Sequence, residues 1–210
     1  MQSKGYLFTV LLVTVVTLAI GVALWHSGTQ ELSIDKECTG WCRGAEEPIV
    51  VIGTFPDFIC SICVNREKLV IQALEIYPDE VRVDYHHYYP TTHEFSFTLG
   101  EALECAGEQG MFWELHDKFY LGQAPVNMSE ILTAAESIGL DMVLFTDSLN
   151  SGKFSDKIMA EQEEALANGA EWQSTYINRV KYTGSSTSLE EFCNAIDAAI
   201  EKARAMEDDQ

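Results

Sequence analysis

The segment that most constrains the fold is a short apolar run followed by a cysteine pair and a helical pattern. The run IVVIGTF, Ile49 to Phe55, is rich in β-branched residues and lacks alternation, which is typical of a strand buried on both faces. From Ser61 apolar residues recur at helical spacing until Pro78. The run VRVDYHHYY, Val81 to Tyr89, predicts a second strand. This order predicts a βαβ unit with two parallel strands and a right-handed crossover.

The rest of the chain completes a recognisable order of elements. Residues from about 95 to 168 predict several helices, with breaks at Gly110, Pro125, Gly139 and Gly152. The runs STYIN and RVKYTG then predict two short strands that turn near Asn178 and Arg179. βαβ, a helical block and ββα are the order of a thioredoxin-like α/β fold with a helical insertion.

Three helix starts are expected from side chains that cap a helix. Ser129 and Asp141 precede helical patterns inside the insertion. In the last helical run, TSLEEFCNAIDAAIEKARA, Thr187 and Glu190 fit a capping box.

An apolar segment near the N-terminus predicts a membrane anchor. Residues 5–25 carry no charged side chain and are long enough to cross a bilayer, which takes about 20 apolar residues. The segment is long for a signal peptide and ends in Leu24-Trp25-His26, which favours an uncleaved anchor, with cleavage as the alternative. Residues 1–26 are therefore expected to form a cytoplasmic stub and signal anchor. Residues 27–47 are expected to form a polar tether, residues 48–206 an extracytoplasmic domain, and residues 207–210 an acidic tail.

The charge of the chain argues against one class of partner. Asp and Glu number 33 against 13 Lys and Arg, which gives a formal net charge of −20. Such a surface repels phosphates, so nucleic acid is not expected as a partner.

Cys60 and Cys63 are the main candidates for chemistry. The first cysteine of a Cys-x-x-Cys that begins a helix meets free backbone N–H groups and the positive end of the helix dipole, which favour its thiolate. The second cysteine lies one turn further on, where it can resolve a mixed disulfide. Two other roles are less well supported by the sequence: a zinc site, which lacks a second pair at ligand spacing, and a structural disulfide, which would close too short a loop to stabilise much.

At these residues the chain resembles the DsbA-like thioredoxin-fold oxidoreductases. The segment FPDFICSIC is similar to their active-site pattern, and the resemblance continues through VRVDYHHYYP, ECAGEQGMFWELHDKFY and FTDSLNSGKFSDKI, from about Pro48 to Ala203. The segment CAGEQGMFWELHD points to the membrane-anchored or secreted branch. The resemblance implies that Cys60 is the nucleophile and Cys63 the resolving cysteine, with cysteine-containing proteins as substrates and a redox partner that resets the pair.

The chain departs from that family at residues that tune the pair. Trp172 and Gln173 stand where the resemblance implies Thr and a cis-proline, so their peptide bond is expected to be trans, and Trp172 either lines the substrate groove or packs in the core. Thr54 replaces an acid six residues before the nucleophile, and Asp57 is the nearer acid. Ser61 and Ile62 separate the cysteines without adding positive charge. These changes predict a pair that is less oxidising than the strongest oxidants of the family.

The remaining cysteines and histidines are expected to be structural. Cys38 and Cys42 are expected to form a structural disulfide, with a second redox pair as the alternative. Cys105 lacks the partner that the resemblance implies, because Ser148 stands there, so Cys105 and Cys193 are expected to be free or bridged to each other. Among the histidines, His86, His87 and His93 are expected to be packing or surface residues. The aromatic residues Phe112, Trp113 and Phe119, with His116, are expected in the core of the insertion.

These observations predict a membrane-anchored, extracytoplasmic thiol–disulfide oxidoreductase that needs neither a bound cofactor nor a metal. Two other functions stay open. One is a thioredoxin-fold binding or assembly protein with weakened turnover. The other is a copper- or zinc-handling protein that uses Cys60 and Cys63 with a nearby histidine.

Overall fold

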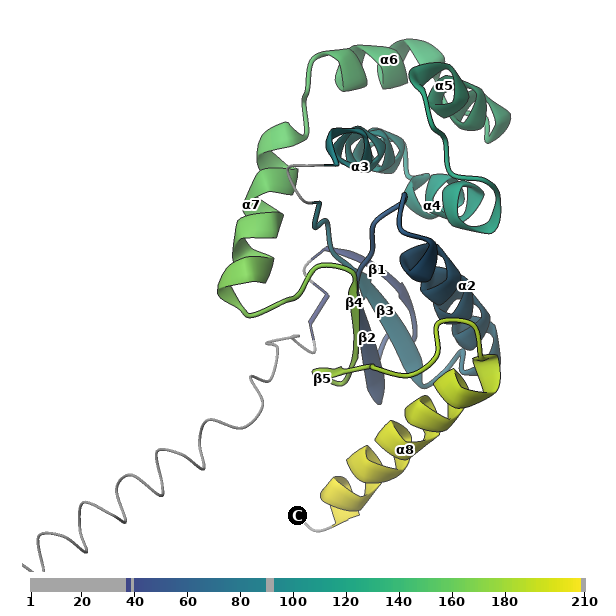
Figure 1. Ribbon diagram of the computed structural model, residues 1–210, viewed down its shortest axis with the longest axis vertical. Helices are drawn as coiled ribbons and strands as arrows, with labels where there is room; N and C mark the ends of the chain where they lie inside the picture. Colours follow the sequence, from purple (N-terminus) through teal and green to yellow (C-terminus); the bar gives the residue numbers. More distant parts are fainter. Residues whose placement is uncertain (1–36, 39, 90–92, 209–210) are drawn as a thin grey trace, which may run out of the picture. The chain divides into compact units, whose positions relative to one another are not determined.

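The computed structural model describes residues 37–38, 40–89 and 93–208, all of them in the second of two compact units, Leu32–Gln210. They form a five-stranded sheet with the strand order β1-β3-β2-β4-β5 (Figure 1). Five helices are inserted between β3 and β4, and one helix follows β5. The predicted thioredoxin-like fold with a helical insertion is confirmed.

The βαβ unit lies at the centre of the sheet. Strand β2 (Val50–Phe55) leads into helix α2 (Ser61–Ile76), which leads into β3 (Val81–Tyr85). The two strands are parallel, as expected, with Val50 opposite Val81. Regular pairing of β3 ends at Tyr85, four residues earlier than the sequence suggested.

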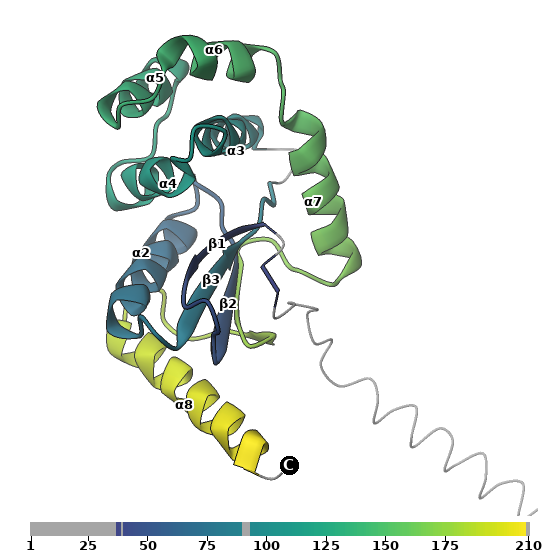
Figure 2. The same cartoon turned by 180° about the vertical axis from the view of Figure 1, so that it is seen from behind.

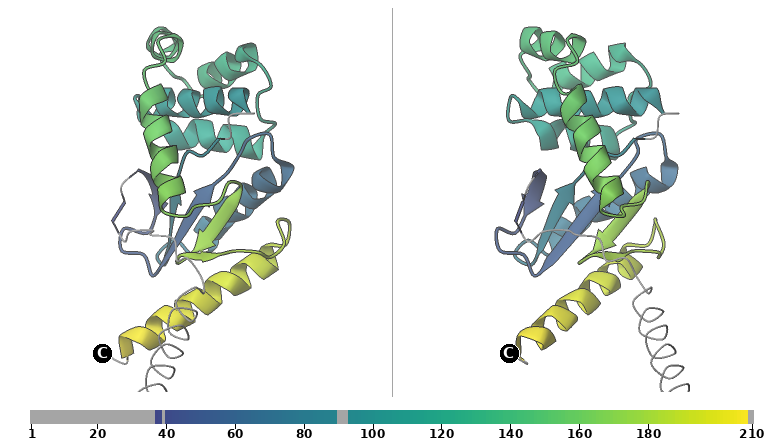
Figure 3. Two further views of the ribbon diagram at one scale, coloured as in Figure 1. Left: turned by 60° about the vertical axis from the view of Figure 1, so that its left-hand side comes forward. Right: turned by 90° about the vertical axis from the view of Figure 1, so that its left-hand side faces the viewer.

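Side chains of β2 alternate between two layers. Val50 and Ile52 pack against α2 and the last helix, α8 (Leu189–Asp208). Val51 and Phe55 point to the opposite face, where Ala165 of helix α7 (Ser155–Ala167) covers them. Figure 3 shows α7 and α2 on opposite sides of the sheet. Helices on both faces explain why this strand is buried along its whole length.

The first strand shows that the predicted boundary between tether and domain is wrong. Residues 41–44, which we expected in a polar tether, form β1 (Trp41–Gly44), an edge strand antiparallel to β3. The Trp41 ring stacks on Phe112 with 4.3 Å between ring centroids, and its indole N–H donates to Glu104 at 2.8 Å. A side chain at Gly107 would collide with the Trp41 ring, so glycine allows this approach. Aromatic packing thus ties β1 to the inserted helices, which a periodicity search over a polar segment does not detect.

The hairpin after the insertion is confirmed. Strand β4 (Ser174–Ile177) pairs antiparallel with both β2 and β5 (Val180–Lys181). Asn178 and Arg179 between them have φ angles of 44° and 69°, and positive φ at both central residues matches the twist of a two-residue hairpin.

The inserted helices occupy almost the predicted range, and most of them gather beyond one end of the sheet (Figure 1 and Figure 2). Their bounds are α3 Glu94–Gly107, α4 Phe112–Leu121, α5 Met128–Ser137, α6 Met142–Asn150 and α7 Ser155–Ala167. They enclose a core of their own that includes Phe112, Phe119 and Phe58, which lies two residues before Cys60. His116 is also buried, whereas Trp113 is only partly buried at the edge of this core.

Two of the three predicted helix starts need correction. Asp141 caps α6 as expected, because its side chain accepts hydrogen bonds from Val143 and Leu144 N–H. Helix α5 is capped by Asn127, two residues before Ser129. Helix α8 begins after Ser188, whose hydroxyl accepts from Glu191 N–H at 3.2 Å, so the predicted Thr187 capping box is wrong by one residue. Helix α8 also continues through Asp208, into the segment predicted as an acidic tail.

The membrane anchor predicted for residues 5–25 lies outside the described residues. Within the described part of the chain, no helix has the length and apolar character that a membrane crossing requires.

Candidate active site

The two cysteines of the candidate site stand at the first turn of α2. Cys60 is the N-cap residue, with an extended backbone, and its sulfur accepts a hydrogen bond from Cys63 N–H at 3.3 Å. Cys60 is half-buried, whereas Cys63 is 4% exposed. Ser61 and Ile62 between them are both exposed. The arrangement presents one sulfur to the surface and keeps the other inside, as exchange through a mixed disulfide requires.

The buried thiol is held in its protonated form. Burial, followed by the hydrogen bond with Cys60, raises the pKa of Cys63 well above its ordinary value. A backbone hydrogen bond from Asp57 acts in the opposite direction, and the charge of Asp57 raises the pKa further. The interior sulfur therefore keeps its proton until a reaction removes it.

Asp57 was expected as a nearby acid and proves to be fully buried. Its carboxylate oxygens lie 2.5 Å from His93 Nδ1 and 2.5 Å from the Ser96 hydroxyl. His93 stands at the N-cap of α3, so these contacts join the active-site segment to the insertion. The sequence did not predict His93 and Ser96 as partners of Asp57, because residues about 36 positions apart share no periodic pattern.

Thr54 lies on the central strand and is also fully buried. Its backbone pairs with Tyr85 on one side and Thr175 on the other. Its hydroxyl has no hydrogen-bond partner among the described residues. The position at which the resemblance implies an acid thus holds a buried hydroxyl, which does not titrate.

The loop before β4 approaches the same end of β2. Ser174 pairs with Phe55, the last residue of β2, so Trp172 and Gln173 directly precede that point. The Trp172–Gln173 peptide bond is trans, as expected, and Gln173 has a φ of 60°. Trp172 is 36% exposed and packs edge-on against His93 with 5.2 Å between ring centroids. Trp172 is therefore a surface residue beside the site, not a core residue.

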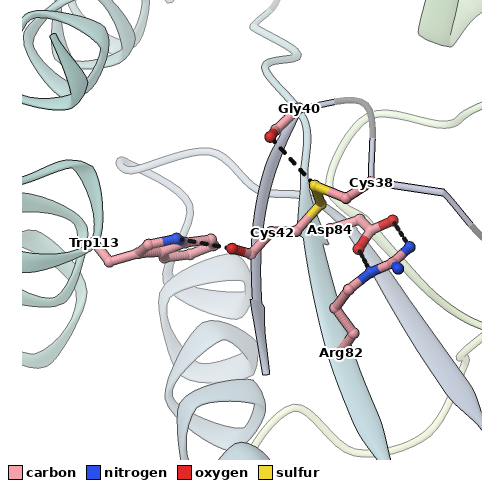
Figure 4. The surroundings of a disulfide bond; sticks show 6 residues. All are labelled: Cys38, Gly40, Cys42, Arg82, Asp84 and Trp113. Carbon is pink, nitrogen blue, oxygen red and sulfur yellow. Dashed lines mark hydrogen bonds and ion pairs between the residues drawn. A yellow bond between two sulfur atoms is a disulfide. The ribbon is translucent and has the colours of Figure 1, made fainter. Parts of the chain in front are cut away.

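Cys38 and Cys42 form a disulfide at the edge of the sheet, with β3 between them and β2 (Figure 4). The carbonyl of Cys42 accepts a hydrogen bond from the Trp113 indole at 3.2 Å. Next to it, Arg43 pairs with Asp117 at 2.7 Å. The disulfide ties Cys38 to the second residue of β1.

The remaining two cysteines are both free. Cys105 is buried in α3 and Cys193 half-buried in α8, so the alternative bridge between them is not formed. Ser148 stands in α6, where its hydroxyl donates to Glu108 at 2.7 Å.

One group of described side chains has donor atoms close enough for a metal ion: His87, Glu104 and Glu161, within 4.8 Å of one another. Glu104 already accepts hydrogen bonds from His87, Trp41 and Lys157. A cation would have to displace Lys157, so this cluster is better described as a buried polar network. Cys60 and Cys63 do not belong to any such group within the described ranges.

A second buried polar group lies between α2 and α4. Glu67, one turn beyond Cys63, is 3.4 Å from His116, and both are at most 2% exposed. The Tyr120 hydroxyl nearby has a raised pKa, chiefly from burial and then from the charge of Glu67. In the sequence, Glu67 stands among apolar residues on the predicted buried face of a helix. This position was the available sign that Glu67 is a buried acid.

Comparison with known proteins gives two kinds of relative. A family model described as thioredoxin matches residues 36–198. Curated relatives include the Na(+)/H(+) antiporter NhaA 3 of Salinispora tropica, 26% identical over 77% of this chain, and NhaA of Herminiimonas arsenicoxydans, 25% identical over 64%. These matches cover 25% and 21% of the two antiporters, so this chain spans about a quarter of the length of those relatives.

Solved structures with the same fold are DsbA-like proteins. A variant of α-DsbA1 from Wolbachia pipientis matches with a TM-score of 0.69 at 16% identity, over 84% of this chain and 98% of that one. Oxidised BdbD from Bacillus subtilis matches with a TM-score of 0.65 at 13% identity, over 80% and 100%. A thioredoxin-like oxidoreductase from Silicibacter pomeroyi matches with a TM-score of 0.65 at 21% identity, over 77% and 92%.

The family model covers most of the chain, and the βαβ unit, inserted helices and hairpin agree with these neighbours. The chain therefore belongs to the thioredoxin family and has the DsbA-like form of its fold.

Proposed function

We propose that the chain is a thiol–disulfide oxidoreductase that exchanges disulfides with protein cysteines through Cys60 and Cys63. The observation that carries this proposal is the pairing of a half-buried sulfur at a helix N-terminus with a buried thiol one turn later. The DsbA-like neighbours agree with this reading.

Exchange proceeds through a mixed disulfide between Cys60 and the substrate. In one direction, the Cys60 thiolate attacks a substrate disulfide and releases one substrate thiol. The Cys63 thiolate then attacks Cys60, closes the Cys60–Cys63 disulfide and releases the second substrate thiol. The reverse sequence oxidises a substrate dithiol, and the potentials of the two partners decide the net direction.

The surface beside Cys60 suits an unfolded chain. Ile59 and Ile62 on either side of Cys60 are each 54% exposed, and Trp172 adds an exposed aromatic ring. Exposed apolar side chains around a reactive sulfur favour substrates whose own apolar residues are not yet buried.

We propose that the Cys60–Cys63 pair has a moderate reduction potential, because charged groups that would tune it are missing around the two cysteines. Thr54 does not titrate, and Ser61 and Ile62 add no positive charge beside Cys60. A potential near −120 mV, the strongly oxidising end of the range, would contradict this expectation.

The activity is tested with the full chain in detergent, in insulin reduction and in reoxidation of reduced ribonuclease. Cys60→Ala should abolish both activities, because Cys60 and Cys63 are the two free cysteines of the described chain that lie three residues apart, and Cys63, left on its own, is buried. Cys193→Ala is the matched control, since it removes a half-buried free thiol in α8. Equal rates for wild type and Cys60→Ala would overturn the proposal and leave a binding or assembly role.

A membrane location is part of the same proposal and rests on the charge-free residues 5–25. The domain would face the extracytoplasmic side, where disulfides persist. In sealed inside-out vesicles, protease should leave residues 37–208 intact, and digestion without detergent would reject this orientation.

A further inference from the structure

A groove of about 580 Å³ lies at the outer edge of the sheet and has no part in the exchange steps given above. One wall consists of the β4–β5 hairpin and the segment that follows it, within the range 177–184, and the other wall is α8. In Figure 1, β5 is the strand at the edge, and the last turns of α8 extend beyond the strands. The volume is ordinary for a binding site.

The backbone of β5 and of the segment after it has hydrogen-bonding groups that point out of the sheet. Tyr182 N–H donates to Thr175 C=O at 2.8 Å, so the backbone of Tyr182 faces β4. Because the N–H and C=O groups of successive residues in a strand point to opposite sides, those of Lys181 and Thr183 point away from β4. Both residues are exposed. An edge with such groups can pair with one more strand.

Helix α8 presents an apolar surface along the same edge. Its buried face packs into the core with Phe192, Ile196 and Ile200. A second face, made of small or apolar residues, lines the groove with Ala195, Ala198, Ala199, Ala203 and Met206. Met206 is 59% exposed, and Val180 on the β5 side is 58% exposed. Apolar side chains gathered around a groove mark an interaction site, and a floor of alanines leaves room for aliphatic side chains of another chain.

The charges at the groove favour an acidic partner. Lys202 lines it from α8, and none of the ion pairs among the described residues includes this side chain. Lys181 lies on the β5 side and pairs with Glu171 at 2.6 Å. A second copy would bring its own Lys181 and Lys202 to the same edge, and two chains of formal net charge −20 repel each other. The groove therefore suits a different chain that carries an acidic residue.

The groove begins at the end of the sheet that is remote from Cys60. Ser174, the first residue of β4, pairs with Phe55 at the end of β2 that leads to Cys60. Ile177, the last residue of β4, pairs with Ile52, so β4 runs away from the cysteine pair. Strand β5 starts from that far end. A segment docked along β5 therefore leaves Cys60 accessible.

We propose that the groove binds an extended segment of a partner protein, which adds a strand to β5. Lys181 and Thr183 provide the backbone hydrogen bonds, the alanine face of α8 receives aliphatic side chains at every second position, and Lys202 pairs with an acidic residue. From Glu191 to Met206, α8 is about 22 Å long, a length that about six or seven residues of strand span. This docking goes beyond the exchange activity and does not depend on it.

The test titrates the full chain in lipid nanodiscs, which keep free detergent out of the groove, with the acetylated and amidated peptides TVTVTE and ETVTVT. Each peptide carries valines at alternate positions and one acidic end, and the two orders serve either strand direction. With saturating peptide, hydrogen exchange at the N–H groups of Lys181 and Thr183 should slow at least about tenfold, because both become bonded. Exchange at Tyr182, which already bonds to β4, should stay within about twofold of the free chain.

Matched variants test the role of the charge. Lys202→Glu should weaken binding of the acidic peptide about tenfold, and the peptides TVTVTK and KTVTVT should bind this variant about as tightly as the acidic peptide binds wild type. Lys118→Glu is the control, since it changes the net charge equally at an exposed lysine of α4 and should leave the affinity within about twofold. Cys60→Ala should bind like wild type, so a failure of the proposed exchange activity does not affect this result.

The inference is overturned if neither acidic peptide binds below about 1 mM, or if one binds without slowing exchange at Lys181 and Thr183. It is also overturned if the chain alone forms dimers that Val180→Lys separates, because a second copy then fills the groove. Equal affinity of wild type and Lys202→Glu would reject it as well, since the charge at the groove would then select no partner.

Discussion

The sulfur of Cys60 accepts a hydrogen bond from the backbone N–H of Cys63 at 3.3 Å, so the residue that caps α2 is also the proposed nucleophile. The cap satisfies one of the free N–H groups of the first helical turn and brings the two sulfur-bearing residues together. The cap of the helix and the proposed reactivity therefore depend on the same side chain. Cys63 contributes its backbone to this cap and keeps its own thiol buried.

The raised pKa of Cys63 predicts a redox-dependent loss of stability in alkali. In the unfolded chain the thiol ionises above its ordinary pKa of 9.0, whereas burial keeps it protonated in the folded chain. Its stabilising contribution is complete below pH 9.0 and is lost as pH rises beyond that value. We expect the free energy of unfolding of the reduced chain, measured in urea, to fall above pH 9.0.

The oxidised chain is the control, because a disulfide does not titrate. Burial also raises the pKa of Cys105, to about 12. Its ionisation therefore lowers the free energy of unfolding at high pH equally in the reduced and the oxidised chain. The reduced chain should therefore show the steeper fall, and parallel curves would contradict the assignment of Cys63.

Gln173 provides a second prediction, about the position at which the resemblance implies a proline. Its φ is 60°, while a proline ring fixes φ near −65°. Gln173→Pro should destabilise the domain by about 1–3 kcal/mol in urea unfolding. Gln173→Gly is the matched control and should be neutral or stabilising by up to about 1 kcal/mol, since glycine adopts positive φ freely. A Gln173→Pro variant as stable as wild type would show that this loop can rearrange.

The disulfide between Cys38 and Cys42 is predicted to serve stability, not exchange. A disulfide across so short a loop restricts the unfolded chain only modestly, so it should stabilise the folded domain by at most about 2 kcal/mol. The double variant Cys38→Ser/Cys42→Ser should lose about that much stability while insulin reduction stays unchanged. Lost reduction activity with unchanged stability would instead identify a second redox pair.

Local patterns in the sequence were sufficient to predict the βαβ unit, the hairpin and the position of Cys60 and Cys63. β-Branched residues in Val50–Phe55 need helices on both faces, and the switch to helical spacing at Ser61 marks the start of α2. The cap by Cys60 follows from its place at that switch. These features depend on neighbours within a few residues, so the sequence displays them directly.

Features that depend on distant side chains could not be predicted. Strand β1 exists because Trp41 packs on Phe112 and bonds to Glu104, more than 60 residues away in the chain. The buried carboxylate of Asp57 has His93 as a hydrogen-bond partner only because the fold brings the two residues together. Neither contact leaves a periodic signal, and a polar segment with a lone aromatic residue looks like a tether.

Glu104 gives the final prediction, which concerns acid. Burial alone would raise its pKa, but hydrogen bonds from His87, Lys157 and Trp41 outweigh burial and lower the pKa to about 2. Its ionised form therefore stabilises the folded chain above pH 4.5, and this contribution is lost as pH falls toward 2. Glu104→Gln should lower the free energy of unfolding at neutral pH by about 3 kcal/mol. The difference from wild type should shrink between pH 4.5 and 2, whereas Glu94→Gln on the exposed side of α3 should show no such difference. A Glu104→Gln deficit that is constant with pH would mean that packing, not charge, makes Glu104 important.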